Sequence, residues 1–269
     1  MHAVSKGTCD IANVWLAMCG FVWRYRNNES TRENDMKKKE APVQQGQEEQ
    51  LPKVVGVLPA GIESKFEFYN FGHALEILTQ SCKVEWADFL ECLRAFSIPI
   101  EDIMTAGGNE SPIPKRLDDL LYPRGWREIR ITGDLLIKLF PRRSDSKRGQ
   151  FSDTPFDERT IQGFIDGHNI DFVKNKVAFD LEWNSKDQTF DRDLLAMRTY
   201  FDCGLIDVGI IVTRAEELND IFRTKGVMAK YGASTTWMGK LLYRLKARRN
   251  GGCPILAVGI KKACVEGMK

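Results

Sequence analysis

Residues 168–187 of the chain read His-Asn-Ile-Asp-Phe-Val-Lys-Asn-Lys-Val-Ala-Phe-Asp-Leu-Glu-Trp-Asn-Ser-Lys-Asp. From Val177 to Asn184 this stretch alternates strictly between apolar side chains and small or polar ones. A period of two predicts a β-strand that buries one of its faces. The other face would carry Asp180 and Glu182 side by side, and two carboxylates repel each other unless a cation or a proton lies between them.

The residues before this strand predict a second strand that pairs with it in a hairpin. Residues 169–173 carry Asp171 at their centre, and Asn175 with Lys176 would form a two-residue turn. With that turn Asp171 lies opposite Asp180, so that three acids share one face of the hairpin. A slip of one residue would move Asp171 to the other face, and the register is therefore part of the prediction.

Three carboxylates that converge on one strand face favour a hard divalent cation such as Mg²⁺, which takes oxygen ligands and keeps waters for a substrate phosphate. A cation held there polarises a phosphoryl oxygen and lowers the pKa of a bound water. We therefore predict Asp171 and Asp180 as metal ligands, and Glu182 as the residue nearest the attacking water, either as base or as a further ligand. The alternative is an exposed hairpin whose acids pair with neighbouring lysines, namely Lys174, Lys176 and Lys186.

Composition and charge set broad limits. The chain has 269 residues, 43% hydrophobic and 28% charged, which is ordinary for a folded α/β or α+β protein with one good core. The net charge of +2 does not by itself indicate a nucleic-acid partner, but basic residues cluster in two runs. Each run is either a solvated surface or a functional one. The runs are Arg142, Arg143, Lys147, Arg148 and Arg244, Lys246, Arg248, Arg249.

Cysteine and histidine usage excludes several classes of site. The seven cysteines are odd in number and never spaced as Cys-x-x-Cys, which argues against a disulfide framework and against a zinc site. Three histidines are too few for a His-rich metal centre. We expect free thiols in a reducing compartment, and hence a cytoplasmic protein with no membrane partner.

The first part of the chain has a different composition from the rest. Residues 24–50 are dense in Glu, Lys, Arg, Asn and Gln, so we predict a largely disordered extension over residues 1–54 and a folded domain over residues 55–269. The apolar run Ile11–Trp23 is shorter than the about 20 residues that span a bilayer, and no small-residue cleavage site follows it. It is either a signal or anchor segment or, as we prefer, part of the extension.

Periodicity and capping residues predict the remaining elements. Helices are predicted at residues 73–80, 85–96, 112–121, 191–203 and 216–223, and a short basic helix or a turn at 239–248. Strands are predicted within residues 126–140 and at 205–213 and 254–260, and loops at 141–160 and 231–237. The side of the helix at 191–203 expected to face the core carries Leu194, Leu195, Arg198 and Phe201. This order of elements indicates an α/β fold with a central mixed β-sheet flanked by helices.

At the hairpin the sequence also resembles a known family. An acid on one strand followed by acid-x-acid on the next resembles the metal-dependent nuclease core written PD-(D/E)xK, and residues 170–187 resemble type II restriction endonucleases of the BglII and BstYI kind. The likeness continues in order over about residues 70–260. It includes residues 73–74, 107–109, 125–126, 190–194, 204–209, 234–241 and 251–256.

The resemblance implies a restriction-endonuclease-like core and an enzyme that cuts double-stranded DNA at a short palindrome with Mg²⁺. It also implies a homodimer and a cognate DNA methyltransferase in the same system. Carried over by position, the catalytic acids of the family fall on Asp171 and Asp180, and its last active-site position falls on Glu182.

The sequence departs from the family pattern at three places. No proline precedes Asp171, Asp180 is one methylene shorter than the expected glutamate, and Glu182 stands where the superfamily has lysine and BglII has glutamine. These departures leave the identity of the base open, and they keep a catalytically impaired DNA-binding relative as an alternative. A carboxylate-pair hydrolase acting on a substrate such as a glycoside is a further alternative. Asp180 and Glu182 lie about 7 Å apart along a strand, but no aromatic-rich cleft sequence accompanies them.

Two segments are candidates for reading DNA bases. The first continues directly out of the catalytic strand, which would couple recognition to cleavage, and its lysine suits guanine while its asparagine suits adenine. The residues of the first are Asn184, Ser185, Lys186 and Asp187, and those of the second are Ser234, Thr235 and Thr236. The basic run at 142–148 is a candidate for phosphate contacts, and every one of these segments has an alternative as a plain turn or solvated loop. A twofold dimer would read a palindrome with one surface used twice.

Overall fold

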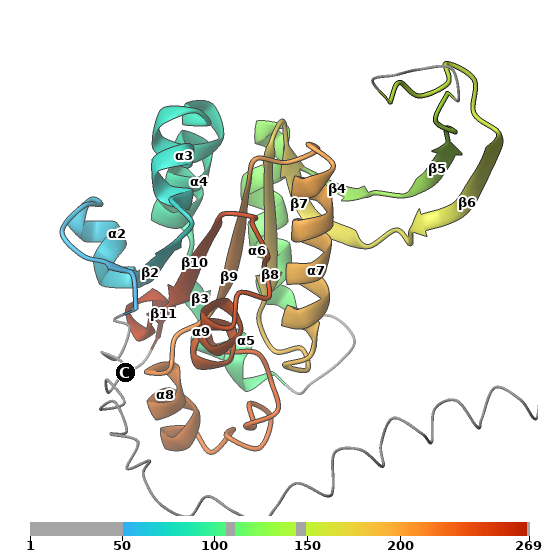
Figure 1. The fold of residues 1–269 in the computed structure, drawn as a ribbon. Coiled ribbons are helices and arrows are strands. Elements are labelled where there is room, and N and C mark those ends of the chain that lie inside the picture. The colour runs from blue at the N-terminus through green and yellow to red at the C-terminus, as the bar shows by residue number, and fades with distance from the viewer. Residues whose placement is uncertain (1–50, 106–110, 144–148, 268–269) are drawn as a thin grey trace, which may run out of the picture. The chain divides into compact units, whose positions relative to one another are not determined.

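The computed structural model describes residues 51–105, 111–143 and 149–267. At its centre is a seven-stranded sheet in the order β1-β2-β10-β9-β8-β7-β4 (Figure 1). Strands β8, β9 and β10 run parallel, whereas the other pairs are antiparallel, so the predicted mixed sheet is confirmed. The bounds are β1 Lys53–Val54, β2 Phe66–Phe71, β4 Arg127–Arg130, β7 Asn169–Lys174, β8 Val177–Glu182, β9 Val208–Arg214 and β10 Ile255–Ile260.

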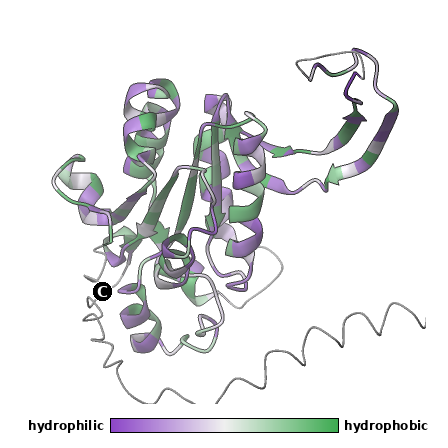
Figure 2. Ribbon diagram, viewed as in Figure 1, coloured by the Kyte–Doolittle hydropathy of each residue, from purple (hydrophilic) through white to green (hydrophobic). Residues whose placement is uncertain are grey.

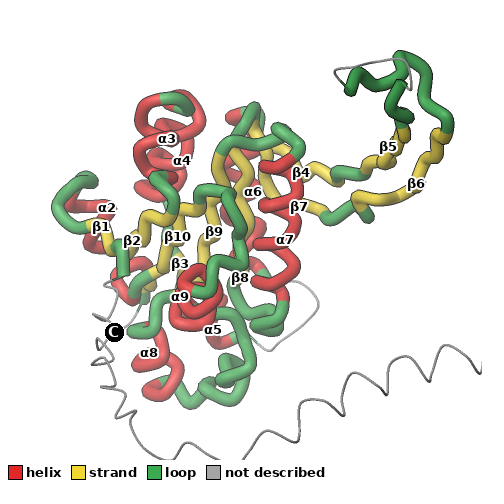
Figure 3. The backbone as a smooth tube through the Cα atoms, in the orientation of Figure 1, coloured by secondary structure: helices red, strands yellow, loops and turns green. Residues whose placement is uncertain are grey.

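Helices pack on both faces of this sheet, as Figure 3 shows with helices in red and strands in yellow. One cluster of buried residues joins the sheet to helices such as α3, α4 and α6, and a second cluster joins it to α7 and α9. The central strands are largely hydrophobic along their length (Figure 2). The helices are α2 Ala60–Lys65, α3 Ala74–Gln80, α4 Lys83–Ala95, α5 Ile100–Met104, α6 Pro112–Leu121, α7 Thr189–Asp202, α8 Leu218–Thr224 and α9 Met238–Lys246, with short 3-10 turns η2 Tyr122–Arg124 and η3 Lys262–Cys264.

The hairpin formed by β7 and β8 has the predicted register. Lys174 pairs with Val177 and Phe172 with Phe179, so the turn consists of two residues, the first of which, Asn175, has a φ of 49°. Asparagine tolerates this left-handed conformation better than most residues, which suits it to a tight hairpin turn. Continuing the same register places Asp171 opposite Asp180.

The prediction that β8 buries one face only is wrong, because all six of its residues are buried. Phe179 and Leu181 pack in the cluster with α4, whereas Ala178 packs in the cluster with α7. Helix α7 therefore covers the face that carries the acids. Asp180 and Glu182 are 4% and 7% exposed, and they are buried acids rather than surface ones.

Helix α7 forms where it was predicted, and Leu194 and Phe201 pack against the core as expected, but the helix is rotated so that Leu195 and Arg198 are exposed. Leu195 is 60% exposed, whereas Phe190, Asp193, Met197 and Tyr200 are buried. The hydrophobic spacing alone permitted either side, and the two aromatic rings at positions 190 and 200 with the small Ala196 between them fit the sheet surface. This rotation brings Asp193 under the hairpin.

The predicted loop at 141–160 is wrong in its last part. Strand β6 Asp157–Ile165 pairs with β5 Gly133–Leu139 in a separate two-stranded ribbon, which Figure 1 shows beyond β4 and β7. Nearly all of its residues are exposed, so polar side chains replace the apolar alternation that would signal a strand. A further two-stranded sheet pairs β3 Ile98–Pro99 with β11 Val265–Glu266.

The predicted N-terminal extension lies almost wholly outside the described residues. Strand β1 pairs with β2 through Lys53 and Val54, so the sheet begins just before the expected boundary at residue 55. Helix α6 starts as predicted, with the Ser111 hydroxyl accepting a hydrogen bond from the Ile113 amide at 3.3 Å. Within the described part of the chain, no helix has both the length and the apolar character needed to cross a membrane.

Candidate active site

The two facing acids of the hairpin are tied to each other's backbone. The Asp171 amide donates to Asp180 Oδ1 at 2.9 Å, and the Leu181 amide donates to Asp171 Oδ2 at 3.0 Å. Each carboxylate thereby accepts a hydrogen bond from a backbone amide of the facing strand. Asp180 Oδ2 is buried and has no hydrogen-bond partner among the described residues. The pair is thus oriented by the strands and keeps an oxygen free.

Glu182 is the last residue of β8 and lies on the same face of the strand as Asp180. Its Oε2 accepts a hydrogen bond from the Thr189 hydroxyl at 2.9 Å, which comes from the first turn of α7. Its backbone carbonyl accepts one from the Thr213 hydroxyl at 2.7 Å. Strand and helix therefore hold both ends of this residue in place.

The lysines next to the hairpin do not neutralise these acids. Lys174 Nζ pairs with Asp88 at 2.6 Å and donates to the Arg124 carbonyl, while Lys176 Nζ donates to the carbonyl of Gly204. No ion pair within the described ranges joins Lys186 to the three acids. The alternative of an exposed hairpin with paired acids therefore does not describe this site.

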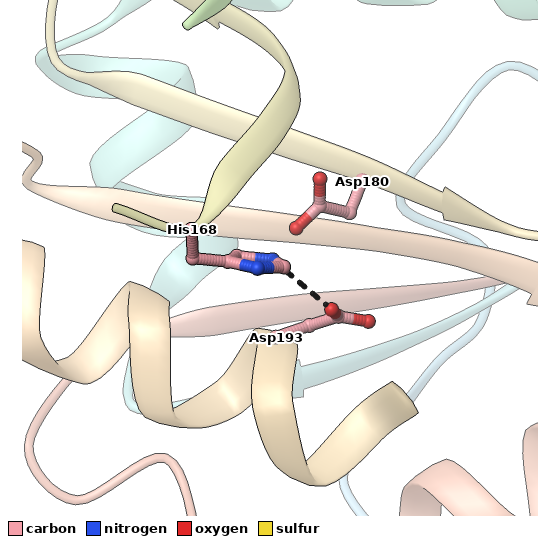
Figure 4. A group of neighbouring side chains, drawn as sticks. All are labelled: His168, Asp180 and Asp193. Carbon is pink, nitrogen blue, oxygen red and sulfur yellow. Dashed lines mark ion pairs between the residues drawn. The ribbon is translucent and has the colours of Figure 1, made fainter. Parts of the chain in front are cut away.

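Two residues that sequence reasoning missed belong to the same cluster. Asp193 of α7 is 1% exposed, and its Oδ1 lies 3.3 Å from Nε2 of His168, which precedes β7. Figure 4 shows His168, Asp180 and Asp193 converging on one space between the hairpin and the helix. Helical spacing could have found Asp193, because it follows Phe190 by three residues and precedes Met197 by four, which places it on their buried face.

Burial and mutual repulsion raise the pKa values of the acids. The pKa of Glu182 rises from 4.5 to about 8, through burial first and then the charge of Asp193. The pKa of Asp180 is raised well above its ordinary value by burial, by Asp193 and by Asp171. Burial and Asp193 also raise the pKa of Asp171, against the hydrogen bond from Leu181. Asp171 is exposed to solvent. Ionisation therefore costs the most free energy at the two buried carboxyls, those of Asp180 and Glu182.

The two predicted base-reading segments lie side by side. Lys186 and Thr235 form an antiparallel bridge, the Asp187 amide donates to the Ser234 carbonyl, and the Thr236 amide donates to the Ser185 carbonyl, both at 2.9 Å. Buried Arg214 stabilises the second segment, because its Nε donates a hydrogen bond to the Thr236 carbonyl at 2.7 Å. Segments about fifty residues apart in the sequence therefore form one surface next to Glu182.

The side chains of this surface differ in how far they are exposed and in whether they already bond within the protein. Ser185, Lys186 and Ser234 are exposed, whereas Thr236 is 0% exposed, which argues against a base contact by its side chain. The remaining predicted residues are engaged within the protein. Asn184 donates to the Lys230 carbonyl, Asp187 pairs with Lys240 and Arg244, and the Thr235 hydroxyl bonds with Gly232 and Arg214.

The basic runs are only partly available to a partner. Residues 144–148 lie outside the described residues, and Arg143 pairs with Asp153. In the second run Arg244 is buried and pairs with Asp187 and Asp191, and Arg249 pairs with Asp191 as well. Much of the second run is therefore structural.

Comparison with known proteins identifies the family. Residues 66–260 match the family described as restriction endonuclease BglII/BglIII. The chain belongs to this family. The match spans the sheet from β2 to β10, including the hairpin and α7. A search of curated proteins finds no match.

Membership in the BglII/BglIII family establishes the class of activity. The chain is a restriction endonuclease, a phosphodiester hydrolase whose substrate is DNA. Such enzymes are typically metal-dependent, and the acidic cluster around Asp180 is a candidate site for the metal. The resemblance seen in the sequence and the expected fold are confirmed.

Proposed function

We propose that this restriction endonuclease cuts double-stranded DNA at a short palindrome, with Asp171, Asp180 and Glu182 as its catalytic acids and Mg²⁺ as its cofactor. One observation carries the proposal. In a chain of the BglII/BglIII family, two acids face each other across a hairpin with a third at the end of the same strand, and no lysine neutralises them within the described residues.

The donor atoms fit a hard divalent cation. Asp171, Asp180 and Glu182 offer carboxylate oxygens, which Mg²⁺ prefers, and the buried Asp180 Oδ2 lacks a hydrogen-bond partner among the described residues. When bound, the cation would stabilise negative charge on the scissile phosphate and make water a better nucleophile. A cation would also relieve the repulsion that raises the pKa values of these acids.

Glu182 is the proposed proton acceptor for the attacking water. Burial and the charge of Asp193 raise its pKa to about 8, and a cation on the neighbouring acids would lower it toward the range in which the carboxylate accepts a proton. The Thr189 hydroxyl donates to Oε2, and the carboxyl also contacts the side chains of Ser185 and Asp193, so its orientation is fixed. This role takes the place of the lysine expected in the superfamily.

The paired segments at 184–187 and 234–236 are the proposed base-reading surface. Lys186 and Ser234 are exposed there, next to the end of the catalytic strand. A lysine that contacts a guanine edge contributes to discrimination, so Lys186→Gln should weaken cognate binding about tenfold and leave non-specific binding nearly unchanged. Equal weakening on all DNA would instead assign Lys186 to a phosphate.

Cleavage of plasmid DNA tests the proposal directly. The full chain should produce discrete fragments with Mg²⁺ and none with EDTA, and Asp171→Asn should abolish cutting. Asp202→Asn is a matched control, because Asp202 is also an acid but lies exposed in a surface pair with Arg198. Binding without cutting would identify a catalytically impaired relative. Absence of DNA affinity at low salt would overturn both readings.

A homodimer is the proposed assembly, because a palindrome offers the same half-site twice. Sedimentation of the protein with a cognate duplex should give two chains per duplex, and one chain per duplex would contradict it. A DNA methyltransferase of the same specificity is the proposed partner in the cell. Genomic DNA from the source should therefore resist the enzyme, and cutting of that DNA would argue against such a partner.

A further inference from the structure

The space between the hairpin and α7 holds a second set of metal-ligating groups. His168, Asp180 and Asp193 each offer a ligand atom, and these atoms lie within 4.8 Å of one another. In Figure 4 the three side chains approach from separate elements: the segment before β7, the strand β8 and the helix α7. Only Asp180 belongs to the row of acids already assigned.

Helix α7 positions this group through two residues of one face. Asp193 meets the His168 ring at 3.3 Å, and the Tyr200 hydroxyl, two turns further along, donates to the His168 carbonyl at 2.9 Å. Both Asp193 and Tyr200 are 1% exposed. The ring and the backbone of His168 are therefore held together, as a ligand-bearing segment requires.

Two buried carboxylate oxygens in this space accept no hydrogen bond within the described residues. The two atoms are Asp180 Oδ2 and Asp193 Oδ2, and the Asp193 carboxyl contacts that of Glu182. Leaving a buried acceptor unsatisfied destabilises the fold, and more so when the acceptor is charged. Asp193 Oδ1 also lies 3.4 Å from the guanidinium of Arg192, an exposed side chain, which compensates the charge only in part.

The cationic groups near this space do not reach all of its acids. His168 and Arg192 both contact Asp193, whereas Asp180 Oδ2 has no partner among the described residues. A lone ion pair between His168 and Asp193 would leave Asp180 and its free oxygen unmatched. A second cation would balance the negative charge of Asp180 and Asp193 and would coordinate their unpaired Oδ2 atoms.

We propose that His168, Asp180 and Asp193 form a second divalent-cation site that shares Asp180 with the first and prefers a transition-metal ion such as Mn²⁺. The imidazole nitrogen distinguishes it from the first site, because nitrogen ligands suit transition metals better than Mg²⁺. Two cations bridged by one carboxylate lie about 4 Å apart in phosphodiester-cleaving enzymes, where they act on the attacking and leaving oxygens. The proposal rests on the proposed function in taking Asp171, Asp180 and Glu182 as the first site.

Binding of Mn²⁺ to the full chain without DNA tests this site independently of cleavage. Calorimetry and electron paramagnetic resonance should show two Mn²⁺ per chain with exchange coupling between them. His168→Gln and Asp193→Asn should each lower the number to one and remove the coupling. Asp202→Asn should still bind two. Added Mg²⁺ should displace one Mn²⁺ more readily than the other.

The outcomes separate this proposal from the proposed function. One Mn²⁺ per chain in the wild type, or two in both His168→Gln and Asp193→Asn, overturns the second site, even when Asp171→Asn abolishes cleavage. Two coupled Mn²⁺ in a protein that does not cut DNA supports the second site and counts against the function. If one variant fails to fold, the other and the coupled signal of the wild type still decide the result.

Discussion

Replacing Glu182 with glutamine should remove a pH-dependent loss of stability. Glu182 is 7% exposed, and its pKa is raised from 4.5 to about 8 by burial and by Asp193. The folded protein therefore holds a proton on this carboxyl more tightly than the unfolded chain does. The associated stability is fully present below pH 4.5 and is lost as the pH rises through about 8.

The size of this loss follows from the two pKa values. Each tenfold difference in proton affinity corresponds to about 1.4 kcal/mol, so the interval from 4.5 to about 8 corresponds to on the order of 5 kcal/mol. This figure is an upper limit, because the pKa values of the hairpin acids Asp171 and Asp180 are raised as well and their protonation is coupled to that of Glu182. A loss of about 2–5 kcal/mol is large beside the about 5–15 kcal/mol that stabilises a typical domain.

Urea unfolding followed by tryptophan fluorescence, in EDTA at pH 5 and pH 8.5, measures the effect. The wild type should lose stability between these pH values, and Glu182→Gln should lose much less, because glutamine still accepts the Thr189 hydrogen bond without carrying a charge. Glu91→Gln is the matched control, since Glu91 is exposed in a surface pair with Arg124. A divalent cation at pH 8.5 should restore the wild type. Equal stability of the wild type at both pH values would refute the reasoning.

Three further predictions concern other parts of the molecule. Arg214→Met should cost about 1–3 kcal/mol and speed hydrogen exchange at the Thr236 amide, because the carbonyl of Thr236 loses its buried donor; unchanged exchange would contradict this. Phe89→Ala should lower the free energy of unfolding by about 3–5 kcal/mol, since the ring is 0% exposed, and a loss below about 1 kcal/mol would show that the core collapses around the gap. In a chain lacking Cys9 and Cys19, Ellman's reagent should label exposed Cys203 at once, whereas Cys92, whose pKa burial raises to about 12, should react only in urea. Rapid labelling of Cys92 in the native protein would count against this.

Local patterns were sufficient for the hairpin and most of its neighbours. The alternation at 177–184, together with an Asn-Lys turn, predicted the strand pairing that sets Asp171 opposite Asp180. Turn length and strand period act between residues close in the chain, so no distant contact is needed to choose this register. The helix capped by Ser111 and the buried strands β9 and β10 were predictable for the same reason.

The exposed ribbon and the face of α7 were not predictable in this way. Strand β6 carries polar side chains on both sides, and only its pairing with β5 defines it. Leu194 and Leu195 permit two orientations of α7, and the fit of Phe190 and Tyr200 against the sheet selects the one that buries Asp193. Such a fit depends on surfaces that exist only after the sheet has formed.

The sequence by itself therefore determined the hairpin, its three acids and, through the ordered family motifs, the class of enzyme. Only the tertiary structure decided that Asp180 and Glu182 are buried, that His168 and Asp193 join Asp180, and that residues 184–187 and 234–236 form one surface. The physical reason is the range of the interactions. Strand period and turns are local, whereas burial, charge repulsion and metal-ligand geometry arise between elements that the fold brings together.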